Sequence, residues 1–423
     1  MSQSILVFSY YTNMPGSCQA EWIDDRMLAF VDKQYDITVI SAICCFTHTN
    51  PKIKHKKVPA LSPHAAGFEY EECKRRNIPI QNSIWSGYLF VMHQIDKFFK
   101  KMHISSGEGR WTWFFTSFLA GFRIQTLRKC SFIFTTGGPA SAHLSGILLG
   151  KIFGKKIMCE LQDPLSGKDI GRNKVSNIGL QFVEKLIVRF ADCTIYCTRS
   201  AMEYAREKYP FQAKKIFFVY PGSNKIQQET GFAYLKEKEQ MQHPTINITY
   251  LGSLYQTRNM DTMMEAIRSL VAEGISVADH LEINLYGNIN PDIRRRILTF
   301  PYPVIHIHGL VSRDIALQKA RQADVLLLIQ NTDDRSINTI PFKTYDYLHT
   351  GKLILALVYK NDELESMMRI HGHMVCQAND IVAIKEKLLE LLHDPKKSYR
   401  AVKTSDLTPA LAVENMLTLI EEK

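Results

Sequence analysis

The sequence predicts an α/β protein built from two doubly wound parallel-sheet domains in tandem. Short apolar segments of strand length alternate with segments of helix length along most of the 423 residues, which is typical of parallel sheets covered by helices on both faces. The alternation stops in a stretch rich in Gln, Glu and Lys, residues 225–244, and then restarts. We therefore predict an N-terminal Rossmann-like domain over 1–221, a C-terminal Rossmann-like domain over 222–405 and a final helix over 406–423 that returns to the first domain.

The first domain is predicted from apolar strands that end in turn residues and lead into helices. Its expected strands are 5–8, 36–42, 132–135, 156–161, 194–196 and 216–219, and its expected helices are 20–31, one ending at 149, 176–190 and 200–208. The segment 84–101 mixes aromatic residues with terminal lysines. A helix there either lies in a membrane interface or packs on its own core, and we favour the core.

The second domain repeats this pattern. Its expected strands are 246–251, 281–286, 305–307, 325–329 and 353–357, and its expected helices are 261–272, 312–321, 341–349 and 380–392, while the final segment holds the expected helix 409–422. Because parallel sheets bind ligands beyond the carboxyl ends of their strands, the functional residues should lie in the loops that follow these strands. Two facing domains also create a cleft, which is a preferred place for a ligand.

The charge of the chain is concentrated in its first half. The protein has 52 Lys and Arg against 42 Asp and Glu, and residues 1–220 hold 29 of these basic and 17 of these acidic side chains. This excess indicates either an ordinary solvated surface or an anionic partner such as a membrane surface or a phosphorylated lipid. Nucleic acid is not expected as a partner, because no nucleic-acid-binding motif is visible.

The N-terminal residues and the cysteines indicate the cellular compartment. The first residues lack the pattern of a secretory signal, and the nine cysteines include no CxxC pair, so we expect a reducing cytoplasm and no structural metal. The segment 131–154 has Lys151 as its one charged residue and contains Gly137, Gly138 and Pro139. It suits a strand, a glycine turn and a buried helix better than a membrane span.

Two loops of the second domain are candidate ligand sites. In the first, Gly252 follows a strand and Arg258 precedes a helix, so backbone amides and a guanidinium are available to a phosphate. In the second, Gly309 and Val311 follow a strand, where backbone groups suit the edge of a nucleobase. Each pattern is also compatible with a plain strand-to-helix turn.

The segment 338–355 is the most specific of the three. Pro341 suits a helix start, Lys343 and Asp346 lie on one face of the predicted helix, and Gly351 suits the residue after its end. A cation and a carboxylate arranged in this way suit a diphosphate and a ribose, since carboxylates commonly accept hydrogen bonds from ribose hydroxyls. The alternative is a salt bridge within the helix.

In this order, these segments resemble family 4 glycosyltransferases, which have the GT-B fold and use nucleotide sugars. The resemblance covers most of the chain and is strongest over 246–357. In the first half it rests on three shorter segments: Thr135 to His143, Met158 to Pro164, and Ala191 to Met202 followed by Val219 to Gly222.

The resemblance implies roles for individual residues. The donor-binding positions would be Gly16, Gly252, Ser253, Arg258, Gly309, Val311, Thr339, Lys343 and Asp346. Arg258 falls where the family places a diphosphate-binding lysine, and Asp346 occupies the second acidic position of its E-x7-E motif. The sequence departs from the family at two positions, because Ser253 replaces an arginine and Asn338 replaces the first acidic residue. Lys343 is expected to compensate for the missing arginine.

The reaction implied by this resemblance is sugar transfer from a nucleoside diphosphate sugar, with retention at the anomeric carbon. Arg258 and Lys343 would stabilise the leaving diphosphate, and no metal or other cofactor is expected. Asp163 would orient or deprotonate the acceptor hydroxyl, although it also suits a turn cap. The paired aspartates Asp24-Asp25 and Asp333-Asp334 lack a third ligand, and we interpret all four residues as surface residues.

The basic first half, together with the family, points to a lipid-linked saccharide acceptor at the inner face of the cell membrane, as in surface polysaccharide assembly. The protein would then be cytoplasmic and in peripheral contact with that membrane. Two alternatives remain open. One is a non-hydrolysing sugar-nucleotide 2-epimerase, which shares two such domains, and the other is a non-catalytic scaffold that binds a nucleotide sugar.

Overall fold

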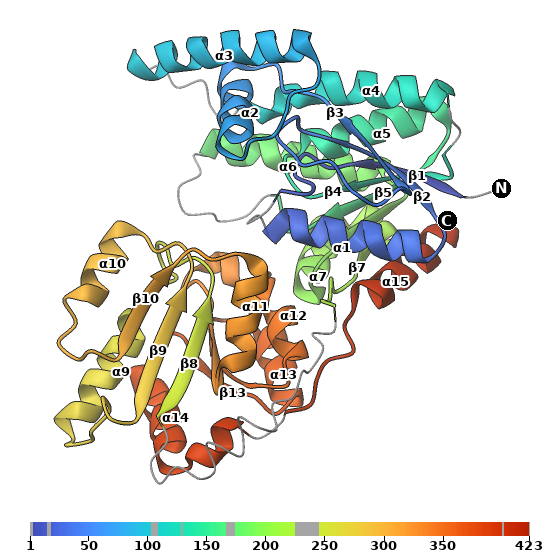
Figure 1. Cartoon of the computed structure of the whole chain (residues 1–423). Coiled ribbons are helices and arrows are strands. Elements are labelled where there is room, and N and C mark those ends of the chain that lie inside the picture. Colours follow the sequence, from blue (N-terminus) through green and yellow to red (C-terminus); the bar gives the residue numbers. More distant parts are fainter. Residues whose placement is uncertain are drawn as a thin grey trace. The chain divides into compact units, whose positions relative to one another are not determined.

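The structure is a computed structural model that describes residues 3–14, 18–102, 109–127, 130–165, 174–224, 245–399 and 402–422. The chain forms two compact units (Figure 1). The first unit joins residues 1–221 to the C-terminal segment 409–423, and the second unit is residues 222–408. Each unit is a parallel sheet with helices on its faces.

The first unit contains a seven-stranded sheet in the order β3-β2-β1-β4-β5-β6-β7. Its strands are β1 (Ser4–Phe8), β2 (Asp36–Ser41), β3 (Ile53–Lys57), β4 (Phe132–Thr136), β5 (Lys156–Leu161), β6 (Cys193–Tyr196) and β7 (Ile216–Phe218). Its α-helices are α1 (Cys18–Asp32), α2 (Pro63–Arg75), α3 (Ser83–Lys101), α4 (Trp113–Leu127), α5 (Ser141–Phe153), α6 (Lys174–Phe190), α7 (Arg199–Lys208) and α15 (Pro409–Glu421).

Strand β1 shows how this sheet separates two cores. Leu6 and Phe8 pack against α4 and α5 on one face, whereas Ile5 and Val7 pack against α1 and α15 on the other. This alternation is the period-two pattern of a strand buried on both faces. The C-terminal helix α15 is therefore part of the first unit's core, and Lys156 on β5 also donates a hydrogen bond to the Ile420 carbonyl, 3.1 Å away.

A fully buried ion pair lies within the first unit. The Nε atom of Arg26 on α1 is 3.1 Å from a carboxylate oxygen of Glu160 on β5, and both side chains are inaccessible to solvent. Thr136 donates to the other Glu160 oxygen at 2.6 Å. Arg26 also donates to the carbonyl of Pro221 at 2.7 Å. The ion pair therefore also anchors Pro221, where the segment 1–221 of the first unit ends.

Several segments of the first unit differ from, or add to, the sequence expectations. The basic cluster 52–57 contains the edge strand β3, and residues 113–127 form α4, which was not predicted. The segment 131–154 holds β4, a glycine turn and α5, as expected. Helix α3 packs against α2 and buries Leu89. In the part of the chain that the structure describes, no helix has both the length and the apolar character needed to cross a membrane.

The second unit contains a six-stranded sheet in the order β10-β9-β8-β11-β12-β13. Its strands are β8 (Ile246–Leu251), β9 (Leu281–Tyr286), β10 (Ile305–Gly309), β11 (Val325–Ile329), β12 (Leu353–Val358) and β13 (Met374–Gln377). Its α-helices are α9 (Asp261–Ala272), α10 (Pro291–Leu298), α11 (Arg313–Gln322), α12 (Lys343–His349), α13 (Asp362–Ile370) and α14 (Ile381–His393). The strand order reverses between β8 and β11, and ligands bind at such switch points in open α/β sheets.

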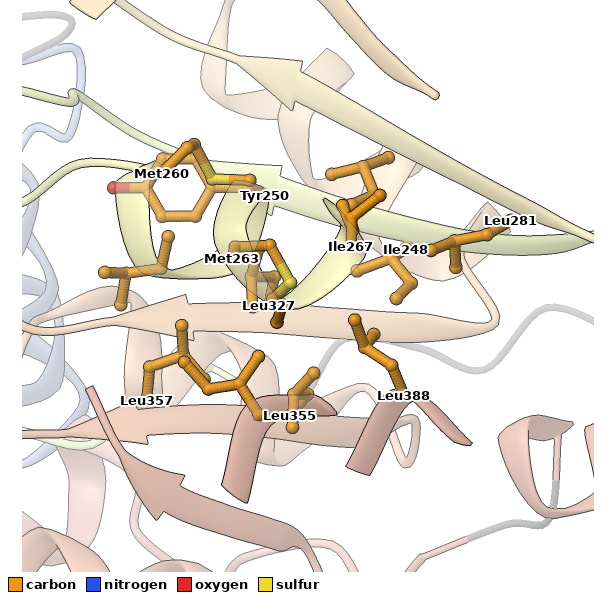
Figure 2. Close-up of a cluster of buried hydrophobic side chains, with 14 of the residues drawn as sticks. Ile248, Tyr250, Met260, Met263, Ile267, Leu281, Leu327, Leu355, Leu357 and Leu388 are labelled. Carbon is orange, nitrogen blue, oxygen red and sulfur yellow. The ribbon is translucent and has the colours of Figure 1, made fainter. Parts of the chain in front are cut away.

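The core of the second unit lies between the central strands and the helices α9 and α14. Figure 2 shows Ile248, Leu327 and Leu355 facing Met263 and Ile267 across this core. Tyr250 lies at one end of the cluster beside Met260, and its hydroxyl points out of the cluster. The apolar core thus fixes the ring of Tyr250, while its polar end remains available to the loops that follow the strands.

The predicted helix at 341–349 begins two residues later than expected. Helix α12 starts at Lys343, so Pro341 precedes the helix. Gly351 has φ +67° and follows the C-cap Thr350, as predicted for a residue after a helix end. Elements α10, α13 and β13 were not predicted, and the stretch 225–244 lies outside the described residues.

Candidate functional site

Three neighbouring strands of the second unit end at glycines with positive φ. Gly252 follows β8 (φ +124°), Gly287 follows β9 (φ +147°) and Gly309 ends β10 (φ +79°). Gly287 donates a backbone hydrogen bond to Gly309 at 2.7 Å, and a Cβ at Gly287 would lie 2.0 Å from the Gly252 carbonyl oxygen. Glycine is required here because a side chain would collide with the adjacent loop. These strand ends therefore form a close-packed rim of backbone.

Lys343 is directed to the first of these glycines. Its ammonium nitrogen lies 3.7 Å from the centre of the Tyr250 ring, and a Cβ at Gly252 would approach that nitrogen to 2.9 Å. A lysine on the face of an aromatic ring is a favourable cation–π arrangement. The structure therefore places Lys343 beside Gly252 at the carboxyl end of β8, next to the switch point.

Arg258 approaches the same tyrosine from the loop after β8. Burial raises the pKa of the Tyr250 phenol, and the nearby charge of Arg258 opposes that shift. The guanidinium also lies 5.5 Å from the centre of the Tyr255 ring, and the backbone amide of Arg258 donates to the Tyr255 carbonyl in a tight turn. Two cations expected from the sequence, Arg258 and Lys343, thus meet at Tyr250.

Asp346 has different partners from those expected. One of its carboxylate oxygens accepts hydrogen bonds from the Ser223 hydroxyl at 2.5 Å and from Arg313 at 3.1 Å. Arg313 begins α11 and also lies 5.6 Å from the centre of the Phe342 ring. The alternative of a Lys343–Asp346 salt bridge is therefore not what these contacts form, because Lys343 lies on the Tyr250 ring and Asp346 pairs with Arg313.

The remaining predicted positions lie along the same edge of the sheet. Ser253 is exposed, and its carbonyl accepts a hydrogen bond from the Tyr250 hydroxyl at 2.9 Å. Val311 is half-buried in the short connection between Gly309 and α11. The Thr339 hydroxyl donates to the Arg335 carbonyl at 2.6 Å, so this threonine helps to shape the loop after β11.

The loops after β8 and β11 are tied together. The Thr257 hydroxyl donates to Asp333, the Thr332 hydroxyl donates to the Thr257 carbonyl at 3.2 Å, and Arg335 donates to the Gln256 side chain at 3.0 Å. Arg335 also pairs with Asp333 and lowers the pKa of that carboxyl to about 2. The interpretation of Asp333 as a surface residue was wrong, because it is buried and connects the two loops.

Two predicted residues belong to the first unit. Asp163 lies two residues after β5 and is exposed. Gly16 lies outside the described residues. Asp24 was interpreted as a surface residue, but it is partly buried and accepts hydrogen bonds from the Thr12 hydroxyl at 2.7 Å and from the Asn13 amide at 2.8 Å. Asp24 therefore anchors the loop that follows β1.

The arrangement in the second unit combines positive charge with accessible backbone. Lys343 and Arg258 meet at the end of β8, and Asp346 and Arg313 lie at the starts of two helices on the same sheet edge. Cations and backbone amides suit a phosphate, and a carboxylate suits a hydroxyl. Within the described ranges, no cluster of three or more His, Cys, Asp or Glu side chains could hold a metal ion.

The sequence analysis missed Arg313, Tyr250 and Ser223. Arg313 was the easiest of the three to predict, because it starts the helix that was expected after Gly309 and Val311. Ser223 could not be recognised in the same way, because 123 residues separate it from Asp346.

The comparisons with known proteins concern the fold. No family model matches the sequence, and no curated protein matches it. Among solved structures, the chain is similar to an α,α-trehalose-phosphate synthase (UDP-forming) from Burkholderia xenovorans in complex with glucose-6-phosphate. The TM-score is 0.65 at 10% identity, over 99% of this chain and 100% of that one.

Two further structures match over nearly their whole length. HepE from Anabaena, in complex with UDP and glucose, has a TM-score of 0.57 at 12% identity over 100% of this chain and 98% of its own. A proposed UDP-N-acetylglucosamine 2-epimerase from Listeria monocytogenes has a TM-score of 0.52 at 12% identity over 99% and 95%. Together with the two helix-covered parallel sheets, these similarities show that the chain has the two-domain, Rossmann-like GT-B fold.

Proposed function

We propose that this protein is a glycosyltransferase of the retaining, family 4 type, which binds a nucleoside diphosphate sugar on its second unit. The proposal rests on one observation: Lys343, Arg258 and Gly252 lie close together around Tyr250, at the carboxyl end of β8. The GT-B structures that bind UDP and sugar, such as HepE, support the same assignment of ligand class.

In this proposal, each residue of the site has a defined task. Lys343 and Arg258 bind the diphosphate and stabilise the negative charge that develops on it as the glycosidic bond breaks. The backbone of Gly252 and Ser253 approaches the phosphates, Gly309 and Val311 meet the nucleobase, and Thr339 borders the sugar. Asp346 accepts hydrogen bonds from ribose hydroxyls while Arg313 fixes its orientation. The mechanism needs no metal ion.

The acceptor is a lipid-linked or free saccharide in cell-surface polysaccharide assembly at the cytoplasmic face of the membrane. The excess of basic residues in 1–220 supports an anionic, lipid-linked acceptor. Asp163 lies beyond the end of β5, where a parallel sheet presents its functional residues. We assign Asp163 to the acceptor hydroxyl, and Asp163→Asn should reduce turnover while nucleotide binding stays unchanged.

The first test is thermal stabilisation by nucleoside diphosphates and their sugars without added metal. Saturation to one hundred times the dissociation constant should stabilise the protein by about 2.7 kcal/mol. Lys343→Ala should abolish most of this shift, whereas Arg268→Ala should retain it. Arg268 is a suitable control because it also lies near an aromatic ring of the second unit, 5.9 Å from the centre of the Phe300 ring, but on α9. If no nucleotide shifts the transition, the proposal fails.

The similarity to the Listeria protein favours a sugar-nucleotide 2-epimerase as the second candidate. Product analysis separates the two activities, since an epimerase converts the nucleotide sugar without an acceptor. A transferase releases the nucleoside diphosphate and forms a glycosidic bond, whose anomeric configuration can be read by NMR. Binding without either product would indicate a scaffold protein.

A further inference from the structure

Helix α4 of the first unit carries apolar side chains on both faces, because Trp113 and Ala120 are buried in the core and other large apolar side chains are exposed on the outer side. Thr116 and Ser117 face inward and are buried, and their hydroxyls contact the Pro59 carbonyl at 2.6 Å and the Ser145 hydroxyl at 2.8 Å. The outward side chains of α4 and of the turn before it are Trp111, Phe115, Leu119 and Phe122, which are 66%, 47%, 61% and 39% exposed. We call these four side chains the α4 outer face.

The spacing of the α4 outer face is that of one continuous helical stripe. Trp111 and Phe115 are in edge-to-face contact, with ring centres 6.2 Å apart. Arg123 is the one charged side chain exposed along 111–124. A helix that is apolar on its outer side is normally covered by another surface.

The neighbouring helix α5 extends this apolar surface. Helices α4 and α5 pack together, as Figure 1 also shows, and the rings of Phe122 and Phe153 lie 5.3 Å apart across their contact. On the outer side of α5, Leu148 and Ile152 are exposed. The apolar surface therefore spans two helices that cover the same face of the sheet.

The exposed charged side chains of the helices on this side of the unit have one sign, and Asp192, which follows α6 and is 29% exposed, lies 3.9 Å from Lys151. In α4, α5 and α6, every exposed charged side chain that the structure describes is basic: Arg123, Lys151, Lys185 and Arg189. The acidic side chain Glu184 of α6 is buried against Tyr196, Tyr209 and Lys208. Aromatic and aliphatic side chains edged by Lys and Arg are the combination that binds the interface of an anionic bilayer.

We propose that the α4 outer face, with Leu148 and Ile152 of α5, is the surface by which this protein docks on an anionic lipid bilayer. The apolar side chains insert at the level of the headgroups, and the surrounding basic side chains pair with lipid phosphates. This assignment differs from the sequence expectation, which considered α3 as the interfacial helix. It is independent of the nucleotide site, because it concerns other elements of the first unit and needs no donor.

The test is co-sedimentation of the full-length protein with vesicles of phosphatidylcholine alone or with phosphatidylglycerol added, without nucleotide. We expect the protein to bind the anionic vesicles and to bind at least tenfold more weakly at 500 mM than at 50 mM salt. The double variant Phe115→Glu/Leu119→Glu should lose tenfold or more of this affinity. Arg123→Gln/Lys151→Gln should weaken binding mainly at low salt.

A matched control is Leu298→Glu/Ile370→Glu, which makes the same charge change at two exposed apolar residues of the second unit. This control should bind vesicles like the unchanged protein. Unchanged melting transitions and nucleotide shifts would show that the α4 variant is folded. The proposal is overturned if the unchanged protein does not bind anionic vesicles. It is also overturned if Phe115→Glu/Leu119→Glu and Leu298→Glu/Ile370→Glu lose binding equally. If the protein is a dimer in solution and Phe115→Glu/Leu119→Glu is a monomer, this face binds a second copy of the chain instead of a bilayer.

Discussion

The ammonium nitrogen of Lys343 fills the space beside Gly252 that a side chain at residue 252 would need. A Cβ at that position would lie 2.9 Å from the nitrogen and 3.3 Å from the adjacent carbon of the lysine. The loop after β8 and the first residue of α12 are therefore mutually dependent, although 91 positions separate them in the numbering. Any residue larger than glycine would displace the cation that we assign to the donor diphosphate.

Gly252→Ala should lower both stability and nucleotide affinity. The positive φ of +124° at Gly252 disfavours a side chain, which costs about 1–3 kcal/mol, and the contact with Lys343 adds to this. The control is Gly274→Ala, because Gly274 also has positive φ, +84°, but open space around its Cβ position. Calorimetry should show destabilisation of both variants and a weakened nucleotide shift in Gly252→Ala alone. An equal nucleotide shift in the two variants would argue against our placement of the donor.

The ion pair between Arg313 and Asp346 should show measurable coupling. Its atoms are 3.1 Å apart and the side chains are 28% and 11% exposed. A double-mutant cycle with Arg313→Met and Asp346→Asn should give an interaction of about 0.5–3 kcal/mol. The exposed pair Arg296–Asp261 is the comparison, and we expect at most about 1 kcal/mol there. Equal values in the two cycles would mean that Arg313 does not orient Asp346.

Removing one member of the buried Arg26–Glu160 pair should strongly destabilise the first unit. Glu160→Gln leaves the Arg26 charge uncompensated where neither side chain reaches solvent, and such losses cost about 3–5 kcal/mol. Glu265→Gln on the exposed pair Arg268–Glu265 should cost less than about 1 kcal/mol. Urea unfolding with hydrogen-exchange readout on β5 would measure both. A small effect of Glu160→Gln would show that the pair does not hold the unit together.

Asp24 and His48 should have opposite effects on the pH dependence of stability. Burial raises the pKa of Asp24 to about 7 and lowers the pKa of His48 to about 4. Between the ordinary pKa of an aspartate and about pH 7, the folded protein keeps the Asp24 proton that the unfolded chain has released. The contribution of Asp24 to stability therefore falls as pH rises towards 7. Between about pH 4 and 6.5, the His48 imidazole is protonated in the unfolded chain but neutral in the folded protein. The contribution of His48 to stability therefore rises over this range.

The two contributions partly cancel in the unchanged protein, and single variants should separate them. Relative to the unchanged protein, Asp24→Asn should gain stability as pH rises from about 4 to 7, and His48→Gln should lose stability as pH rises from about 4 to 6.5. Denaturant titrations at each pH provide the measurement. Slopes of the same sign for the two variants would refute the assignment of these protonation states.

The sequence predicted most elements of the sheets because buried parallel strands and their helices have distinct patterns. The segments 246–251 and 325–329 were recognised in this way. The strand β3 was missed because its alternating lysines look like a charge cluster. Helix α4 was missed because both of its faces carry apolar residues, and the helical period is then weak.

The candidate site was predictable where a residue follows a strand directly. Gly252, Arg258 and Lys343 were named from their positions after β8 and at the start of α12, and the structure brings all three to Tyr250. The protein partner of Asp346 was not predictable, because helical spacing offered Lys343 as the alternative partner, whereas tertiary packing supplies Arg313. Sequence spacing describes neighbours on one element and does not specify which residues of other elements lie opposite them.

The place of α15 in the first core has a consequence for the order of folding during synthesis. Val413 and Met416 fill the side of the sheet that also holds Ile5 and Val7, so the first unit needs residues made after the whole second unit. At translation rates of about 5–20 residues per second, synthesis of 222–408 takes about 10–40 s. The second unit can therefore fold while the first waits on the ribosome with one side of its sheet covered by α1 but not by α15.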